Sequence, residues 1–110
     1  MALTASGNPR AIGEALRLIR IFHDKRSREL ADDLGISASY LSEIEHGHKR
    51  PSLDLIAEYA RVFRTTSSVI LFFVEELDQE GGGREGMPRA RHRMQAFLKA
   101  LERFAPPDDG

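Results

Sequence analysis

The sequence predicts an all-α protein, and three observations lead to this class. Between residues 9 and 78, apolar residues recur at intervals of three and four, the spacing that places side chains on one face of a helix. Asparagine, serine, proline and glycine stand where these segments begin or end, as helix caps do. The connections are short, as in compact helical domains. We therefore expect five helices in residues 9–78, a Gly-rich linker at 79–87 and an amphipathic helix at 88–105.

The first two helices have clear boundaries in the sequence. The first is expected to begin at Pro9 with Asn8 as its N-cap, because a proline loses no hydrogen bond at the first helical position. Ser27 is expected to cap the second helix, and Gly35 to end it in a left-handed conformation. The residues expected to face inward are Ile12, Ala15, Leu16, Ile19 and Phe22 in the first helix, and Leu30, Ala31 and Leu34 in the second.

The next three helices are delimited in the same way. Ser37 is expected to cap the third helix and Gly47 to close it. Pro51 and Ser52 open the fourth helix, and residues 65–68 offer a cap for the fifth. The residues expected to face inward are Ile36 in the turn, Leu41 and Ile44 in the third helix, and Leu53, Ile56, Ala57, Ala60 and Phe63 in the fourth.

Composition narrows the classes of function. The 110 residues fit a single domain, with residues 1–8 as a flexible N-terminus and 106–110 as a disordered tail. The 16 Lys and Arg residues balance 17 Asp and Glu residues, which argues against a protein that coats nucleic acid by charge alone. The absence of cysteine excludes disulfides and zinc–thiolate sites. No secretory signal and no run of apolar residues long enough to span a bilayer are visible, so we expect a cytoplasmic protein with no membrane partner.

The second and third expected helices are separated by Gly-Ile-Ser, a pattern typical of a helix-turn-helix. Such a turn leaves one face of the third expected helix, at 37–46, free to contact a ligand. The residues at its tip are small or polar, which would let the backbone approach a groove floor. A DNA major groove about 12 Å wide admits one α-helix. The pattern therefore favours a DNA-binding surface that begins with Ser37, Ala38, Ser39 and Tyr40.

Residues from about 10 to 72 resemble the Xre/Cro-type, lambda-repressor-like helix-turn-helix domain of bacterial and phage transcriptional regulators. The match rests on Arg20 and on three stretches, ELADDLGIS at 29–37, SYLSEIEHG at 39–47 and RPSLDLIAEYA at 50–60. The resemblance implies a five-helix lambda-repressor-like DNA-binding domain, here with an additional C-terminal amphipathic helix that the resemblance does not cover. It also implies a sequence-specific regulator that binds double-stranded DNA.

The resemblance assigns roles to individual residues. Those nearest the bases would be Ala38, Ser39, Ser42 and Glu43, whose side chains can contact a thymine methyl, exchange hydrogen bonds or accept from cytosine. Glu43 is equally consistent with a solvated position on the helix. Contacts to the DNA backbone would come from Ser27, Arg28, Ser37, Tyr40, His46, His48, Lys49 and Arg50. The family usually has Ser or Thr capping the first motif helix, followed by Gln, whereas this chain has Arg26 and Ser27. Arg20 and Glu45 would form a partly buried ion pair.

Other chemistries have little support in the sequence. His46 and His48 flank Gly47, but no third ligand stands at a convincing spacing, so we expect no metal site. The serines of the motif lack a paired base, and no Gly-rich phosphate-binding loop follows a strand. We therefore expect neither an enzyme nor a cofactor.

The apolar run at residues 69–74 goes all the way around a helix, whereas a surface helix should show one apolar stripe. One side can pack on the core, and we expect the other to form a homodimer interface made of Val69, Ile70, Phe72, Phe73 and Leu77. A symmetric dimer would present two recognition helices about 34 Å apart to an inverted repeat. The alternative is that the helix at 88–105 folds back over this side.

The preferred interpretation is a small dimeric repressor. The alternative is an antitoxin-like protein-interaction module, whose DNA binding would be autoregulatory. In that case the apolar stripe of the helix at 88–105 would capture a partner protein. The stripe consists of Met94, Phe97, Leu98, Leu101 and Phe104.

Overall fold

The computed structural model describes residues 8–81 together with Gln95. Apart from Gln95, the expected helix at 88–105 lies outside the described residues, as do most of the expected linker and nearly all of both termini. The described part contains five α-helices, namely α1 (Pro9–Phe22), α2 (Ser27–Leu34), α3 (Ala38–Glu45), α4 (Leu53–Val62) and α5 (Ser67–Gly81). Every regular element in this range is a helix, so the predicted all-α class is confirmed. Helix α5 ends three residues beyond the predicted domain boundary at residue 78.

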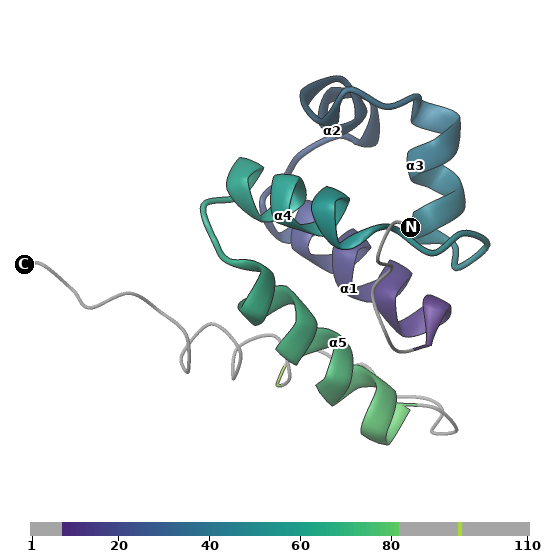
Figure 1. Ribbon diagram of the computed structural model, residues 1–110, viewed down its shortest axis with the longest axis vertical. Coiled ribbons are helices and arrows are strands. Elements are labelled where there is room, and N and C mark those ends of the chain that lie inside the picture. The colour runs from purple at the N-terminus through teal and green to yellow at the C-terminus, as the bar shows by residue number, and fades with distance from the viewer. Residues whose placement is uncertain (1–7, 82–94, 96–110) are drawn as a thin grey trace, which may run out of the picture.

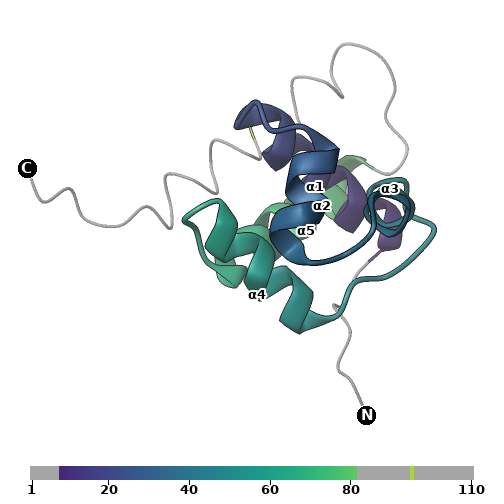
Figure 2. The same cartoon turned by 90° about the horizontal axis from the view of Figure 1, so that it is seen from above.

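Helix α1 lies at the centre of the fold (Figure 1). Helices α3 and α5 both pack on it, α2 packs on α3 and α4, and α4 also contacts α5 (Figure 2). Helix α3 thereby stands at one edge of the molecule, far from the C-terminal end of α4. The most deeply buried core side chains are Ile12, Leu16, Leu30, Leu41, Ile44, Ile56, Tyr59, Ile70 and Phe73.

Helices α1, α3, α4 and α5 begin at the predicted caps, because each cap needs only a side-chain acceptor two or three residues before a free backbone N–H. Asn8 Oδ1 accepts from the Arg10 amide at 2.9 Å. The equivalent bonds of the later helices are Ser37 Oγ with Tyr40 N at 3.0 Å, Ser52 Oγ with Leu55 N at 3.0 Å, and Thr66 Oγ1 with Val69 N at 3.2 Å.

The predicted cap of α2 is wrong by one residue. Ser27 is the first helical residue, and Arg26 takes the N-cap position with extended backbone angles. The Glu29 carboxylate accepts a hydrogen bond from the Arg26 amide at 3.1 Å. A glutamate three residues into the helix thus supplies an acceptor for the N-cap amide, which is one half of a capping box.

Two predicted core positions are wrong. Phe22 ends α1 and is 54% exposed, with its ring edge-on to His23 at 5.4 Å between centroids. Ala57 is exposed, and Tyr59 is buried on the inner face of α4 instead. The Tyr59 hydroxyl donates a hydrogen bond to the backbone carbonyl of Leu16, which joins α4 to α1. That polar partner allows a tyrosine to occupy a core position.

The apolar run of α5 belongs mainly to the core of the single chain. Val69, Ile70, Phe73 and Leu77 are each at most 6% exposed and pack in the common hydrophobic cluster. Phe72 is half-buried at the edge of that cluster. Helix α5 packs on both α1 and α4, so four of the five residues predicted for a dimer interface are buried within the single chain.

No helix within the described ranges is long and apolar enough to cross a membrane.

Candidate nucleic-acid interface

The turn between α2 and α3 is built on Gly35. Its φ of 71° lies in the left-handed region, where a side chain is disfavoured. A Cβ at Gly35 would meet no atom within 4 Å, so glycine is needed here for its backbone conformation and not for space. The Gly35 amide donates to Asp32 O at 3.2 Å, and the Ile36 amide donates to Ala31 O at 3.0 Å. These bonds end α2 and direct the chain into α3.

The outward face of α3 carries the residues expected to read bases. Ala38, Ser39 and Ser42 are exposed, whereas Glu43 is half-buried. The side chains of Ala38, Ser39 and Ser42 are short, so the α3 backbone can come close to a flat or grooved surface. Leu41 and Ile44 lie on the opposite face and are at most 1% exposed, which fixes the helix on the core. The structure therefore brings all four predicted base-reading residues to one element.

The loop after α3 gathers the predicted basic residues. His46, His48, Lys49 and Arg50 are all exposed. The carbonyl of Glu43 accepts from the amide of His48 at 2.8 Å and from that of Lys49 at 3.3 Å, so the loop folds back on the end of α3.

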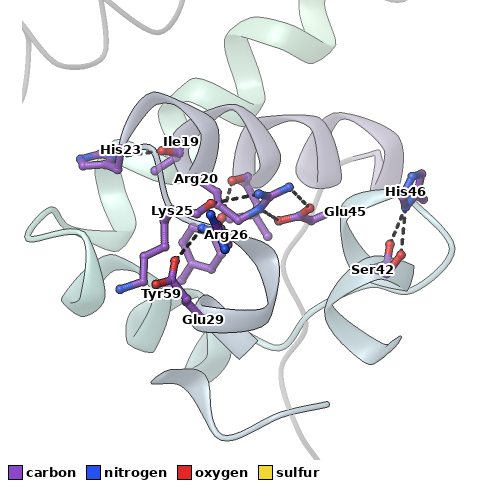
Figure 3. A network of polar contacts seen from close by, with 11 residues as sticks. Ile19, Arg20, His23, Lys25, Arg26, Glu29, Ser42, Glu45, His46 and Tyr59 are labelled. Carbon is purple, nitrogen blue, oxygen red and sulfur yellow. Dashed lines mark hydrogen bonds and ion pairs between the residues drawn. The ribbon is translucent and has the colours of Figure 1, made fainter. Parts of the chain in front are cut away.

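His46 is held against the end of α3 by its ring. His46 Nδ1 lies 2.8 Å from the Ser42 carbonyl oxygen and 3.4 Å from Ser42 Oγ (Figure 3). The His46 and His48 rings are 6.3 Å apart. Within residues 8–81 no group of three or more His, Asp or Glu residues could hold a metal ion.

The other predicted backbone contacts lie at the starts of α2 and α3. Ser27 is half-buried and Arg28 exposed in the first turn of this helix. Ser37 is exposed, and its hydroxyl oxygen accepts the capping bond, so its hydrogen can still be donated to a ligand. Tyr40 is half-buried against the core.

An ion pair anchors α3 to α1. Arg20 Nε lies 2.8 Å from one Glu45 oxygen, and Arg20 Nη2 lies 2.9 Å from the other, a two-pronged arrangement (Figure 3). Arg20 Nη1 also donates to the Lys25 carbonyl at 3.0 Å. The hydrogen bond to the Glu45 carboxylate raises the pKa of Arg20, and burial opposes this shift. The side chain of Glu45 is 4% exposed and that of Arg20 15%, so the pair that the resemblance implied is largely buried and has a positioning role.

Sequence reasoning missed two close contacts between α1 and the end of α3. A Cβ on Gly13 would lie 2.4 Å from Ile44 O and 2.6 Å from Glu45 O, so α1 touches the α3 backbone there. Arg10, which lies one turn before Gly13 in α1, approaches Gly47 in the loop after α3. A Cβ on Gly47 would lie 3.1 Å from both Cα and Cγ of Arg10. Residues 10 and 47 are far apart in the sequence, and no local pattern pairs them.

Comparison with known proteins agrees with this geometry. The model of the family described as helix-turn-helix matches residues 16–70, a segment that includes α2, the turn and α3. This chain belongs to the helix-turn-helix family. The matched segment begins inside α1 and ends inside α5, so it contains the ion pair and the basic loop as well as the motif.

Individual members of the family are also similar to this chain. The transcriptional regulator ClgR of Mycobacterium tuberculosis is 37% identical over 60 residues, which are 54% of this chain and 54% of that protein. The chain thus spans about half the length of this relative. Two crystal structures of the clp gene regulator ClgR from Corynebacterium glutamicum share the fold. One has a TM-score of 0.59 at 31% identity, over 64% of this chain and 91% of that chain. The other has a TM-score of 0.60 at 26% identity, over 90% of both chains.

Proposed function

We propose that this protein binds specific double-stranded DNA sequences through α3 and regulates transcription. The observation that carries the proposal is the outward face of α3. This face combines small exposed residues along the helix with exposed basic residues in the loop that follows it. A helix with such a face fits a major groove, and cations beside it match the phosphates that border the groove. Membership of the helix-turn-helix family supports the same conclusion.

In this proposal the base contacts come from Ala38, Ser39, Ser42 and Glu43. The two serine hydroxyls can donate or accept a hydrogen bond, and the Glu43 carboxylate can accept from cytosine N4. The backbone contacts come from Ser27, Arg28, Ser37, Tyr40, His46, His48, Lys49 and Arg50. They hold the domain in register but carry no sequence information.

The proposal includes a cytoplasmic homodimer that represses transcription from an inverted repeat. Two copies related by a two-fold axis would present their α3 helices one DNA turn apart, about 34 Å. Because most of the apolar run of α5 is buried in the single chain, the dimer surface must use other side chains. Ile21 and Phe22 at the end of α1 are 49% and 54% exposed, and Phe72 is half-buried. Sedimentation velocity of wild-type protein and of Ile21→Ser checks this part, since loss of a dimer only in the variant is the expected result.

The experiment that tests the main proposal is fluorescence anisotropy with three labelled duplexes at roughly physiological salt. One duplex comes from upstream of the protein's own gene, one from upstream of a clp gene, and one is a scrambled control. The clp duplex is chosen because the similar solved structures are described as clp gene regulators. Binding to one of the first two about a thousandfold tighter than to the control is the expected result.

Equal binding to all three duplexes calls for a selection from random sequences, which should return a palindromic site. If the selection enriches no sequence, the proposal of specific recognition is wrong. If no duplex is bound even at low salt, DNA binding itself is refuted, and the interaction module that uses residues 88–105 becomes the better explanation.

A further inference from the structure

Arg10 lies beside the basic loop, although it belongs to a different helix. It stands in the first turn of α1, and its backbone and Cγ face Gly47, the second residue of the loop between α3 and α4. A Cβ on Gly47 would be 3.1 Å from Cα and Cγ of Arg10 and 3.4 Å from its amide nitrogen. Gly47 also has a φ of 81°. Glycine therefore serves two needs here, because it permits both the turn and the close approach of Arg10.

The position of Arg10 relative to α3 is fixed by a second contact. Gly13, one turn further along α1, lies directly against the carbonyl groups of Ile44 and Glu45. The two contacts hold the first turns of α1 against the end of α3 and the start of the loop. Arg10 is thus held at a defined place next to the loop, even though its own side chain is exposed.

The charge of Arg10 is available to a ligand. Within residues 8–81, Arg10 takes part in none of the ion pairs that join Arg20 with Glu45, Lys25 with Asp33 and Arg61 with Glu58. The same loop carries the exposed side chains of His46, His48, Lys49 and Arg50. Arg10 therefore enlarges a local positive surface in a chain whose formal net charge is −1.

We propose that Arg10 binds a DNA phosphate next to those contacted by residues 46–50, which extends the DNA interface from the helix-turn-helix motif onto α1. The inference rests on the proposed function. Arg10 lies beside the C-terminal end of α3, away from the base-reading turns, so its partner is the DNA backbone. A guanidinium suits this role because its N–H groups can form paired hydrogen bonds with phosphate oxygens.

The test is the salt dependence of DNA affinity, measured by anisotropy on a selected site and on scrambled DNA. Each phosphate neutralised by a cation contributes about 0.9 to the slope of log K against log salt. Arg10→Ala should lower the magnitude of this slope by about 0.9 and weaken binding roughly fivefold near physiological salt, for both DNAs alike. Arg10→Lys should keep most of the slope, because the charge is retained.

Arg61→Ala is the matched control. Arg61 lies in the last turn of α4 and is paired with Glu58, at the opposite end of the molecule from the loop (Figure 1). This variant should leave the slope unchanged. The inference is overturned if Arg10→Ala keeps the wild-type slope, if Arg61→Ala lowers it equally, or if Arg10→Ala changes the preferred sequence. In each of these cases the wild-type protein still binds DNA, so only the role of Arg10 is refuted. If the wild-type protein binds no DNA, the proposed function is refuted as well.

Discussion

Removal of Arg20 should destabilise the fold strongly, because it leaves the buried carboxylate of Glu45 without its cation. In Arg20→Met the stem of the side chain is kept, and the two bonds to Glu45 at 2.8 and 2.9 Å are lost. Breaking a buried ion pair by removing one partner costs about 3–5 kcal/mol. Since the Arg20 side chain is 15% exposed and water can reach part of the site, we take the lower end, about 3 kcal/mol.

The lost bond from Arg20 to the Lys25 carbonyl adds about 1 kcal/mol at most, because water can replace the donor. A loss of about 3–4 kcal/mol is a large share of the 5–15 kcal/mol that holds a typical domain together. Urea unfolding followed by far-UV circular dichroism should show it as a lower midpoint with an unchanged slope.

The double variant Arg20→Met/Glu45→Leu completes a double-mutant cycle, which measures the interaction energy between Arg20 and Glu45 apart from their other contacts. Replacing both charges by apolar groups is often neutral, so the double variant should lie within about 1 kcal/mol of wild type and well above Arg20→Met. The coupling energy of the cycle should therefore exceed about 2 kcal/mol. If the two single losses simply add, or if Arg20→Met costs less than about 1 kcal/mol, the reasoning about an uncompensated buried charge is wrong.

Three further predictions test other contacts. Gly13→Ala places a methyl 2.4 Å from Ile44 O, so it should cost about 1–3 kcal/mol in urea unfolding and weaken DNA binding in anisotropy. If its affinity at a temperature where it is fully folded equals that of wild type, the contact does not position α3. Burial raises the pKa of the Tyr59 hydroxyl, whereas the unfolded chain titrates near about 10. Stability should therefore be retained below that pH and fall above it, and Tyr59→Phe should remove part of this fall and cost about 1 kcal/mol at neutral pH. An unchanged alkaline slope in that variant would contradict the assignment. Ser39→Ala should change discrimination at one base pair by about 1–3 kcal/mol in a binding selection, and an equal loss on all sequences would make Ser39 a backbone contact.

Local features of the fold could be predicted from the sequence because they depend on neighbours in the chain. Asn8, Ser37 and Ser52 cap their helices as predicted, since each bond joins residues two or three positions apart. The predicted cap Ser27 was wrong by one residue. The N-cap is Arg26, whose amide donates to the Glu29 carboxylate, a bond that is equally local. The residues of the candidate interface could likewise be predicted, because the motif places them on consecutive turns of one short helix and in the loop that follows it.

Which neighbours cover each helix was decided by the tertiary structure. Helical spacing groups Phe22 with the apolar face of α1, yet its place at the helix end leaves it half exposed. The same spacing could not show that most of the run in α5 is buried between α1 and α4, or that Tyr59 finds a carbonyl partner across the core.

Two glycines show the division between sequence and tertiary structure. Gly35 could be predicted because its left-handed backbone ends a helix, a need that arises within the turn itself. Gly13 stands in the middle of a helix, where the sequence gives no reason for a glycine. Glycine is needed there because α3 packs directly against α1 in the folded chain. A β-carbon on Gly13 would overlap the carbonyl oxygens of Ile44 and Glu45. The sequence by itself determined the five helices of residues 9–81, four of their caps and the motif. Tertiary packing alone decided how closely α1 approaches α3 and which charged residues lie beside it.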